Sequence, residues 1–185
     1  MDSKLQIISG TFRGRKLKIP PVARPTQNRA RVALFNMISG FFYTDSSINV
    51  WDAFAGSGAF GIEILSRYKN ANVVFTDSAS ESIKTIRENL SFLNIGSRAT
   101  TKQIDTMSTI EKNVAKYDLI FVDPPYANND FGTIFVKKWA KFGKTKSILI
   151  WEQDNENSII PELSGIEILR DKTYGRARFT FFIHQ

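Results

Sequence analysis

Short apolar segments alternate with amphipathic ones from about residue 48 onwards, a pattern typical of strand–helix repeats. Segments 48–54, 72–77, 100–104, 117–123 and 147–152 predict buried strands. Helices are expected up to about residue 68, after residue 77, and over 108–115 and 131–141. The second is the clearest, because Ala79, Ile83, Ile86, Leu90 and Leu93 follow helical spacing.

The two ends of the chain depart from this alternation. Segments 166–171 and 177–183 predict strands joined by five residues, too few for a crossover helix, so they should be antiparallel. Segments 5–10 and 15–19 predict a short hairpin, and a helix is expected over 27–39. The predicted fold is α/β, with a mostly parallel seven-stranded sheet, an antiparallel C-terminal edge, and an N-terminal hairpin and helix.

Composition narrows the class of protein. A chain of 185 residues fits one domain of ordinary size, and no apolar run approaches the length of a membrane span. The chain has no cysteine, which excludes disulfides and thiolate metal sites and is typical of a cytoplasmic protein. Its single histidine, His184, excludes a multi-histidine metal centre. We expect a cytoplasmic monomer without metal or membrane.

The basic charge is concentrated at the N-terminus. The net charge is +7, and residues 1–31 hold eight basic side chains against one acidic, whereas the remaining residues balance. We therefore divide the chain into a basic extension, residues 1–45, and a main domain, residues 46–185. The charge favours nucleic-acid binding, with a solvated tail as the alternative. The candidate RNA-binding residues are Arg13, Arg15, Lys16, Arg24, Arg29 and Arg31.

A glycine motif follows the first strand of the main domain. Gly56-x-Gly58-x-x-Gly61 lies between a predicted strand and helix, where glycines permit a tight turn and close approach of a ligand. Asp77 ends the next strand, 21 residues after Gly56, and its carboxylate can accept the hydroxyl hydrogens of a ribose. The pattern fits a dinucleotide or S-adenosylmethionine (SAM); a turn that serves only packing is the alternative.

A second motif, Asp123-Pro-Pro-Tyr126, ends the fourth strand. An exocyclic amine of a base is a poor nucleophile because its lone pair is delocalised into the ring. The Asp123 carboxylate and the Pro124 carbonyl can accept its two N–H hydrogens and aim the lone pair at a methyl group. Tyr126 can stack on an extruded base. The alternative is a strand-end turn with a core tyrosine.

The motifs together resemble a known family. Asp123-Pro-Pro-Tyr126 is similar to the signature of amino-methyltransferases. With Arg24-Pro-Thr, Arg29-x-Arg31-x-x-Leu34-Phe-Asn36 and Phe54-Ala-Gly-Ser-Gly58, the chain from Ile8 to the closing hairpin resembles the RsmD family of bacterial 16S rRNA guanine-N2 methyltransferases. It departs from the family at Asn28, where an acidic residue is usual, and at Val32, where glutamate is usual.

This resemblance implies a Rossmann-like class I SAM-dependent methyltransferase. Its cofactor would be SAM, its product S-adenosyl-L-homocysteine, and its target a guanine of 16S rRNA or of the assembling small ribosomal subunit. Asp105 is implied to bind the adenine amino group; a helix cap before Met107 is the alternative. The implied cofactor-binding residues are Asp52, Phe54, Ala55, Gly56, Ser57, Gly58, Asp77, Ser78, Asp105 and Thr106.

Two other functions stay open at this point. A nicotinamide-dependent oxidoreductase would share the glycine motif and Asp77, although it would not explain Asp123-Pro-Pro-Tyr126. A non-catalytic RNA-binding module could keep the same fold.

Overall fold

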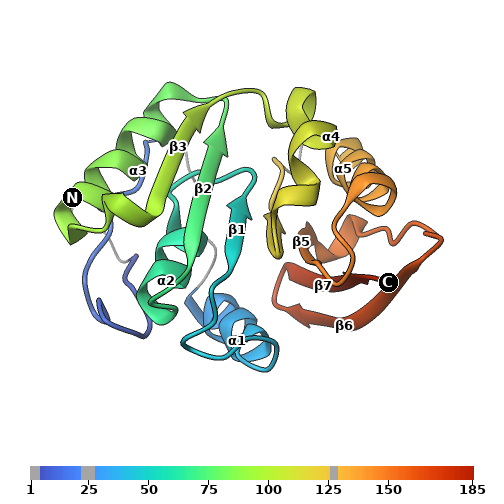
Figure 1. Cartoon of the computed structure of the whole chain (residues 1–185), viewed down its shortest axis with the longest axis horizontal. Helices are drawn as coiled ribbons and strands as arrows, with labels where there is room; N and C mark the ends of the chain where they lie inside the picture. Colours follow the sequence, from blue (N-terminus) through green and yellow to red (C-terminus); the bar gives the residue numbers. More distant parts are fainter. Residues whose placement is uncertain (1–4, 22–27, 126–128) are drawn as a thin grey trace.

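The computed structural model describes residues 5–21, 28–125 and 129–185. One seven-stranded sheet, in the order β3-β2-β1-β4-β5-β7-β6, forms its centre (Figure 1). The first five strands in this order are parallel, whereas β7 runs antiparallel to both β5 and β6. The α/β sheet with an antiparallel C-terminal edge is thus confirmed. The strands are β1 Asn49–Asp52, β2 Asn72–Asp77, β3 Ala99–Gln103, β4 Leu119–Val122, β5 Ile148–Asp154, β6 Ile166–Tyr174 and β7 Ala177–His184.

The helices lie close to their predicted positions. They are α1 Asn28–Ile38, α2 Ala59–Arg67, α3 Ser80–Leu93, α4 Ile110–Asn113 and α5 Asn129–Phe142. The short helix expected near 108–115 is present, but only the four-residue α4 is α-helical, and the 3₁₀ turns Thr106–Thr109 and Val114–Lys116 flank it. Thr109 and Asn113 donate side-chain hydrogen bonds to nearby backbone carbonyls, which compete with helical pairing. No helix of the described residues is both long and apolar enough to cross a membrane.

Side chains alternate between the two faces of the sheet, and each face carries its own core. Val50 and Phe121 point to the face covered by α1, α2 and α3, whereas Trp51 and Ile120 point to the face covered by α4 and α5. Because both faces are covered, β4 is apolar throughout and β5 is apolar over its first four residues, as their sequences predicted.

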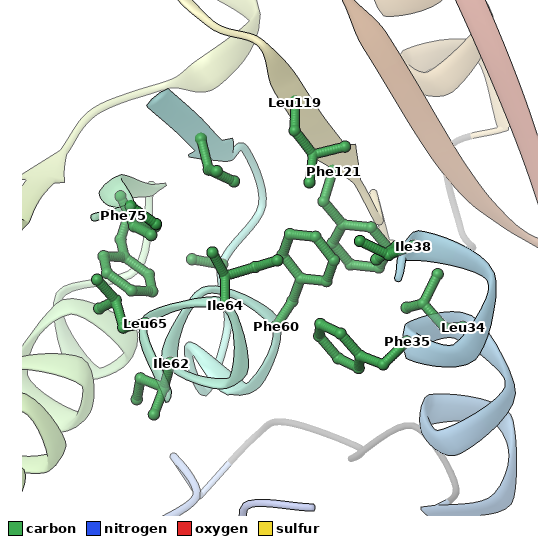
Figure 2. Close-up of a cluster of buried hydrophobic side chains, with 14 of the residues drawn as sticks. Leu34, Phe35, Ile38, Phe60, Ile62, Ile64, Leu65, Phe75, Leu119 and Phe121 are labelled. Carbon is green, nitrogen blue, oxygen red and sulfur yellow. The ribbon is translucent and has the colours of Figure 1, made fainter. Parts of the chain in front are cut away.

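Three stacked aromatic rings join α1 to the sheet. Phe60 of α2 lies between Phe121 of β4, at 4.1 Å between ring centroids, and Phe35 of α1, at 5.5 Å (Figure 2). All three side chains are buried. The stack therefore fixes α1, which lies outside the main domain predicted from sequence, against the end of β4 where Asp123 follows.

The N-terminal segment pairs with itself over a short distance. Gln6 and Lys16 form one antiparallel bridge, and Leu17 donates a backbone hydrogen bond of 2.9 Å to the carbonyl of Leu5. Leu5, Ile7 and Leu17 are buried in the core of the α2 face. The segment is thus packed on the main domain, although it forms one antiparallel bridge and not the two strands that the sequence predicted.

Glu63 of α2 holds this segment in place. Its carboxylate is fully buried and accepts hydrogen bonds from the backbone N–H groups of Ile8 (2.7 Å) and Ser9 (2.9 Å). Arg67 Nε donates to it at 2.7 Å, and Nη2 of Arg31 lies 3.5 Å away. A buried carboxylate needs such partners because desolvation is costly.

Replacing Glu63 should therefore destabilise the whole fold. We expect Glu63→Ala to lower the free energy of unfolding by about 3–5 kcal/mol, since it leaves buried cations without their anion. This corresponds to a fall of roughly 2–4 °C in melting temperature for each 1 kcal/mol. Calorimetry measures the loss, and hydrogen exchange at the Ile8 and Ser9 amides locates it. The exposed Glu81→Ala is the matched control; equal stability of the two variants would contradict this role of Glu63.

Candidate functional site

The glycine motif forms a tight turn between β1 and α2. Gly58 has a φ of 73°, a left-handed conformation that glycine adopts without strain, and it is the N-cap of α2. Gly61 lies in the first turn of the helix, where an added Cβ would come within 2.3 Å of the Phe75 ring of β2. The motif thus brings the start of α2 close to the ends of β1 and β2.

Asp77 fixes this turn from the end of β2. One carboxylate oxygen accepts a hydrogen bond of 2.8 Å from the Gly56 N–H, and the other accepts one of 2.8 Å from the Ala79 N–H. The carboxylate is half-buried. A carboxylate oxygen can accept more than one hydrogen bond, so Asp77 retains capacity for a ligand hydroxyl.

Two further carboxylates lie at the neighbouring strand ends. Asp52 ends β1, is 2% exposed and accepts a hydrogen bond of 3.0 Å from the Gly61 N–H. Burial raises the pKa of Asp52 well above its usual value, and the negative charges of Asp123 and Asp77 add to this effect. Asp123 directly follows β4, and burial raises its pKa to about 7. Burial therefore disfavours the negative charge of both carboxylates in this region.

These groups open into one pocket of about 590 Å³, its mouth included. One wall is apolar and contains the stacked Phe35, Phe60 and Phe121. Asp52 and Asp123 line the polar part together with Arg31 of α1 and Glu152 of β5. The pocket thus combines residues of the glycine turn, of two further strand ends and of the N-terminal extension.

The structure brings most of the predicted cofactor residues to this end of the sheet. Phe54, Ala55, Gly56 and Ser57 line the pocket, whereas Ser78 is exposed beyond β2. The exposed Asp105 caps a 3₁₀ turn by accepting a hydrogen bond of 3.0 Å from the Met107 N–H. Thr106 is buried, and its hydroxyl bonds the Ala53 carbonyl. Their contact with a cofactor stays a prediction.

The second motif is described only in part. Pro124 is buried next to Asp123, at the carboxyl end of β4. Tyr126 lies outside the described residues, so its predicted stacking role stays a prediction.

The predicted RNA-binding residues divide into two groups. Arg13, Arg15, Lys16 and Arg29 are exposed. The Arg15 guanidinium lies 5.7 Å from the ring centroid of Phe92, an exposed aromatic residue of α3. Arg24 lies outside the described residues.

Arg31 differs from the exposed group. It is 3% exposed, donates a hydrogen bond of 3.1 Å to the Gln6 carbonyl and faces Glu63. Desolvation lowers its pKa, and Glu63 opposes this effect. Arg31 therefore belongs to the pocket and to the packing of α1, and it is not part of the exposed basic surface.

Sequence reasoning missed several pocket residues, among them Glu152, Phe35 and Phe60. Glu152 carried a usable signal, because it ends the predicted strand that follows Asp123-Pro-Pro-Tyr126 and carboxyl ends of parallel strands meet at one edge. The phenylalanines carried none, since aromatic residues at helical spacing look like ordinary core. Within the described residues, no group of three or more His, Cys, Asp or Glu side chains is arranged to hold a metal ion.

Comparison with known proteins places this site in a family. The family model described as "Conserved hypothetical protein 95" matches residues 5–183. The Ribosomal RNA small subunit methyltransferase D of Buchnera aphidicola is 33% identical over 168 residues, which cover 87% of this chain and 84% of that protein. The solved structure titled "Putative methyltransferase yhhF from Escherichia coli" has a TM-score of 0.81 at 27% identity and covers 97% of both chains.

A more distant structure agrees in fold. The RNA methyltransferase of Salinibacter ruber in complex with S-adenosyl-L-homocysteine has a TM-score of 0.65 at 12% identity, with 88% of this chain and 95% of that chain covered. The predicted class I methyltransferase fold is thereby confirmed. The chain belongs to the family described as Conserved hypothetical protein 95, the RsmD family of methyltransferases.

Proposed function

We propose that this protein transfers a methyl group from SAM to the N2 amine of a guanine in small-subunit ribosomal RNA. The family relationship supports rRNA methylation. The observation that carries the choice of cofactor is the pair of pocket carboxylates, the buried Asp52 and the half-buried Asp123, beside the glycine turn.

The charge of the pocket favours SAM over a nicotinamide dinucleotide. A dinucleotide places its anionic pyrophosphate at the first N–H groups of the helix after the glycine turn. Here the Asp52 carboxylate already occupies the Gly61 N–H, and Asp123 adds to the negative charge. SAM carries a positive sulfonium and an ammonium group, which such carboxylates stabilise. The residues present therefore fit SAM, which supplies an electrophilic methyl group.

The glycine turn and the strand ends around it would hold SAM. Asp77 would accept the ribose hydroxyls, because it ends β2 and retains acceptor capacity. Asp52 and Phe54 would line the methionine end, inside the pocket. Ser78 and Asp105, exposed at the ends of β2 and β3, would lie at the adenine end.

Asp123 and Pro124 would prepare the acceptor amine. When ionised, Asp123 accepts one N–H of the amine, and the Pro124 carbonyl accepts the other, which turns the nitrogen towards tetrahedral geometry. The apolar wall of Phe35, Phe60 and Phe121 excludes water and thus strengthens these hydrogen bonds. Tyr126 would stack on the extruded base.

A direct test of the function is methyl transfer from labelled SAM to small subunits and to naked 16S rRNA from cells that lack the gene. Mass spectrometry of the RNA then identifies the modified nucleotide. Labelling at a guanine N2 supports the proposal, whereas labelling of another amine would overturn the assignment of guanine. No transfer to either substrate would favour a non-catalytic RNA-binding module.

The first site prediction concerns the cofactor. Asp77→Ala removes a charged acceptor and should weaken SAM binding by roughly 1.5–3 kcal/mol. Isothermal titration measures this change, with the exposed Asp45→Ala as control. The wild-type protein should not bind NAD in the same experiment. Unchanged SAM affinity of Asp77→Ala would remove Asp77 from the ribose site.

The second concerns the pH dependence of methyl transfer. Because the pKa of Asp123 is raised to about 7, the carboxyl is largely protonated at pH 6 and cannot accept the amine hydrogen as an anion. At limiting SAM, the single-turnover rate should fall about tenfold from pH 8 to pH 6. Asp123→Asn should lose roughly 10²-fold or more at pH 8 and no longer show this dependence. A flat wild-type profile, or near-normal turnover of the variant, would contradict the role of Asp123.

The third concerns RNA binding by the exposed basic residues. Replacing Arg13, Arg15 and Lys16 together by alanine should weaken RNA binding and reduce its salt dependence by about two units of slope, at roughly 0.7 per contact. SAM affinity should stay unchanged. The matched control replaces Lys112, Lys137 and Lys141, exposed on α4 and α5, on the other face of the sheet. Equal salt slopes for the two triple variants would show that Arg13, Arg15 and Lys16 do not contact RNA.

A further inference from the structure

Glu152 is a pocket carboxylate that the proposed mechanism does not use. It lies in β5, is 2% exposed and lines the same pocket as Asp52 and Asp123. Its position in the pocket makes Glu152 a candidate for contact with the substrate. The proposed roles of the glycine turn and of the amine-activating motif leave this residue unassigned.

The sheet sets Glu152 beside Asp123. Val122 of β4 pairs in parallel with Trp151 of β5, so the next residues along the two strands are Asp123 and Glu152. Neighbouring strands lie about 4.8 Å apart, and residues at matching positions point to the same face. The pocket therefore presents two carboxylates side by side, from adjacent strand ends.

Guanine is the base whose edge matches such a pair. Its N2 amine lies next to the N1–H, so two hydrogen-bond donors point in the same direction. In adenine the ring nitrogen beside the N6 amine is an acceptor, and the same holds for cytosine beside N4. A carboxylate next to the group that binds the amine therefore attracts guanine and repels the other two bases.

We infer that Glu152 reads the guanine N1–H while Asp123 holds the adjacent N2 amine, which makes Glu152 the residue that selects the base. The inference rests on the proposed function, because it assumes an exocyclic amine at Asp123.

The test changes the base at the target position and the residue at position 152 in the same set of measurements. 2-Aminopurine keeps the amine of guanine, but its N1 is an acceptor. Small subunits are assembled from 16S rRNA that carries either guanine or 2-aminopurine at the target position, and single-turnover rates of methyl transfer are measured on both. The wild-type enzyme should be roughly tenfold to a hundredfold slower on 2-aminopurine.

Glu152→Gln should weaken this preference, because the amide N–H₂ can donate to the N1 of 2-aminopurine. We expect the ratio of the 2-aminopurine rate to the guanine rate to rise at least about tenfold. Glu152→Ala should slow transfer to guanine without gaining activity on 2-aminopurine. The exposed Glu156→Gln is the control and should keep the wild-type ratio.

The outcomes separate this inference from the proposed function. If the wild-type enzyme does not methylate the guanine substrate, the proposed function fails. If it methylates guanine but Glu152→Gln slows both substrates equally, Glu152 is merely structural and the inference is overturned. A circular dichroism melt of each variant confirms that the comparison is made on folded protein, and Glu152→Asp, which retains the carboxylate, should keep the wild-type preference for guanine.

Discussion

The buried charge of Glu63 is the constraint on which the arrangement of this molecule depends. A carboxylate inside α2 must be neutralised, and its partners come from three places: the N-terminal segment, Arg31 of α1 and Arg67 of α2. These contacts fix α1 beside α2, and the ring stack of Phe35, Phe60 and Phe121 extends this order to β4. The ion pairs and hydrogen bonds of Glu63 therefore position the residues that line one side of the pocket.

The pocket holds Asp52 and Asp123 in surroundings that disfavour their ionised forms. Burial raises the folded-state pKa of Asp123 above that of the unfolded chain, so the native state binds protons more tightly. Stability from this group is thus greatest at low pH and is lost as pH rises towards 7, the opposite of a carboxylate held by an ion pair. Asp52 acts in the same direction. A cationic ligand offsets the cost of ionising these carboxyl groups. The same negative charges that destabilise the free protein therefore favour occupancy of the site.

The order of the elements and both motifs could be predicted from sequence, because parallel strands buried on two faces are largely apolar and glycine turns have a recognisable spacing. Asp77 and Asp123 lie at the strand ends where they were expected. The features that could not be predicted from sequence depend on tertiary contacts. Arg31 is part of a basic run in the sequence, yet in the fold it is buried and faces Glu63, 32 residues later. The helix near 108–115 is α-helical over only four residues, and threonine and asparagine side chains bind the backbone locally there.

The position of β7 has a consequence for biosynthesis. It follows β6 in the chain but lies between β5 and β6 in the sheet (Figure 1). As the polypeptide emerges from the ribosome, β6 is made first and has no neighbouring strand to pair with, and β5 keeps an open edge. The two gain their partner together when β7 is inserted. The base-reading side of the pocket, which β5 carries, is therefore among the last parts of the enzyme to mature, after the turn of the glycine motif can already have formed.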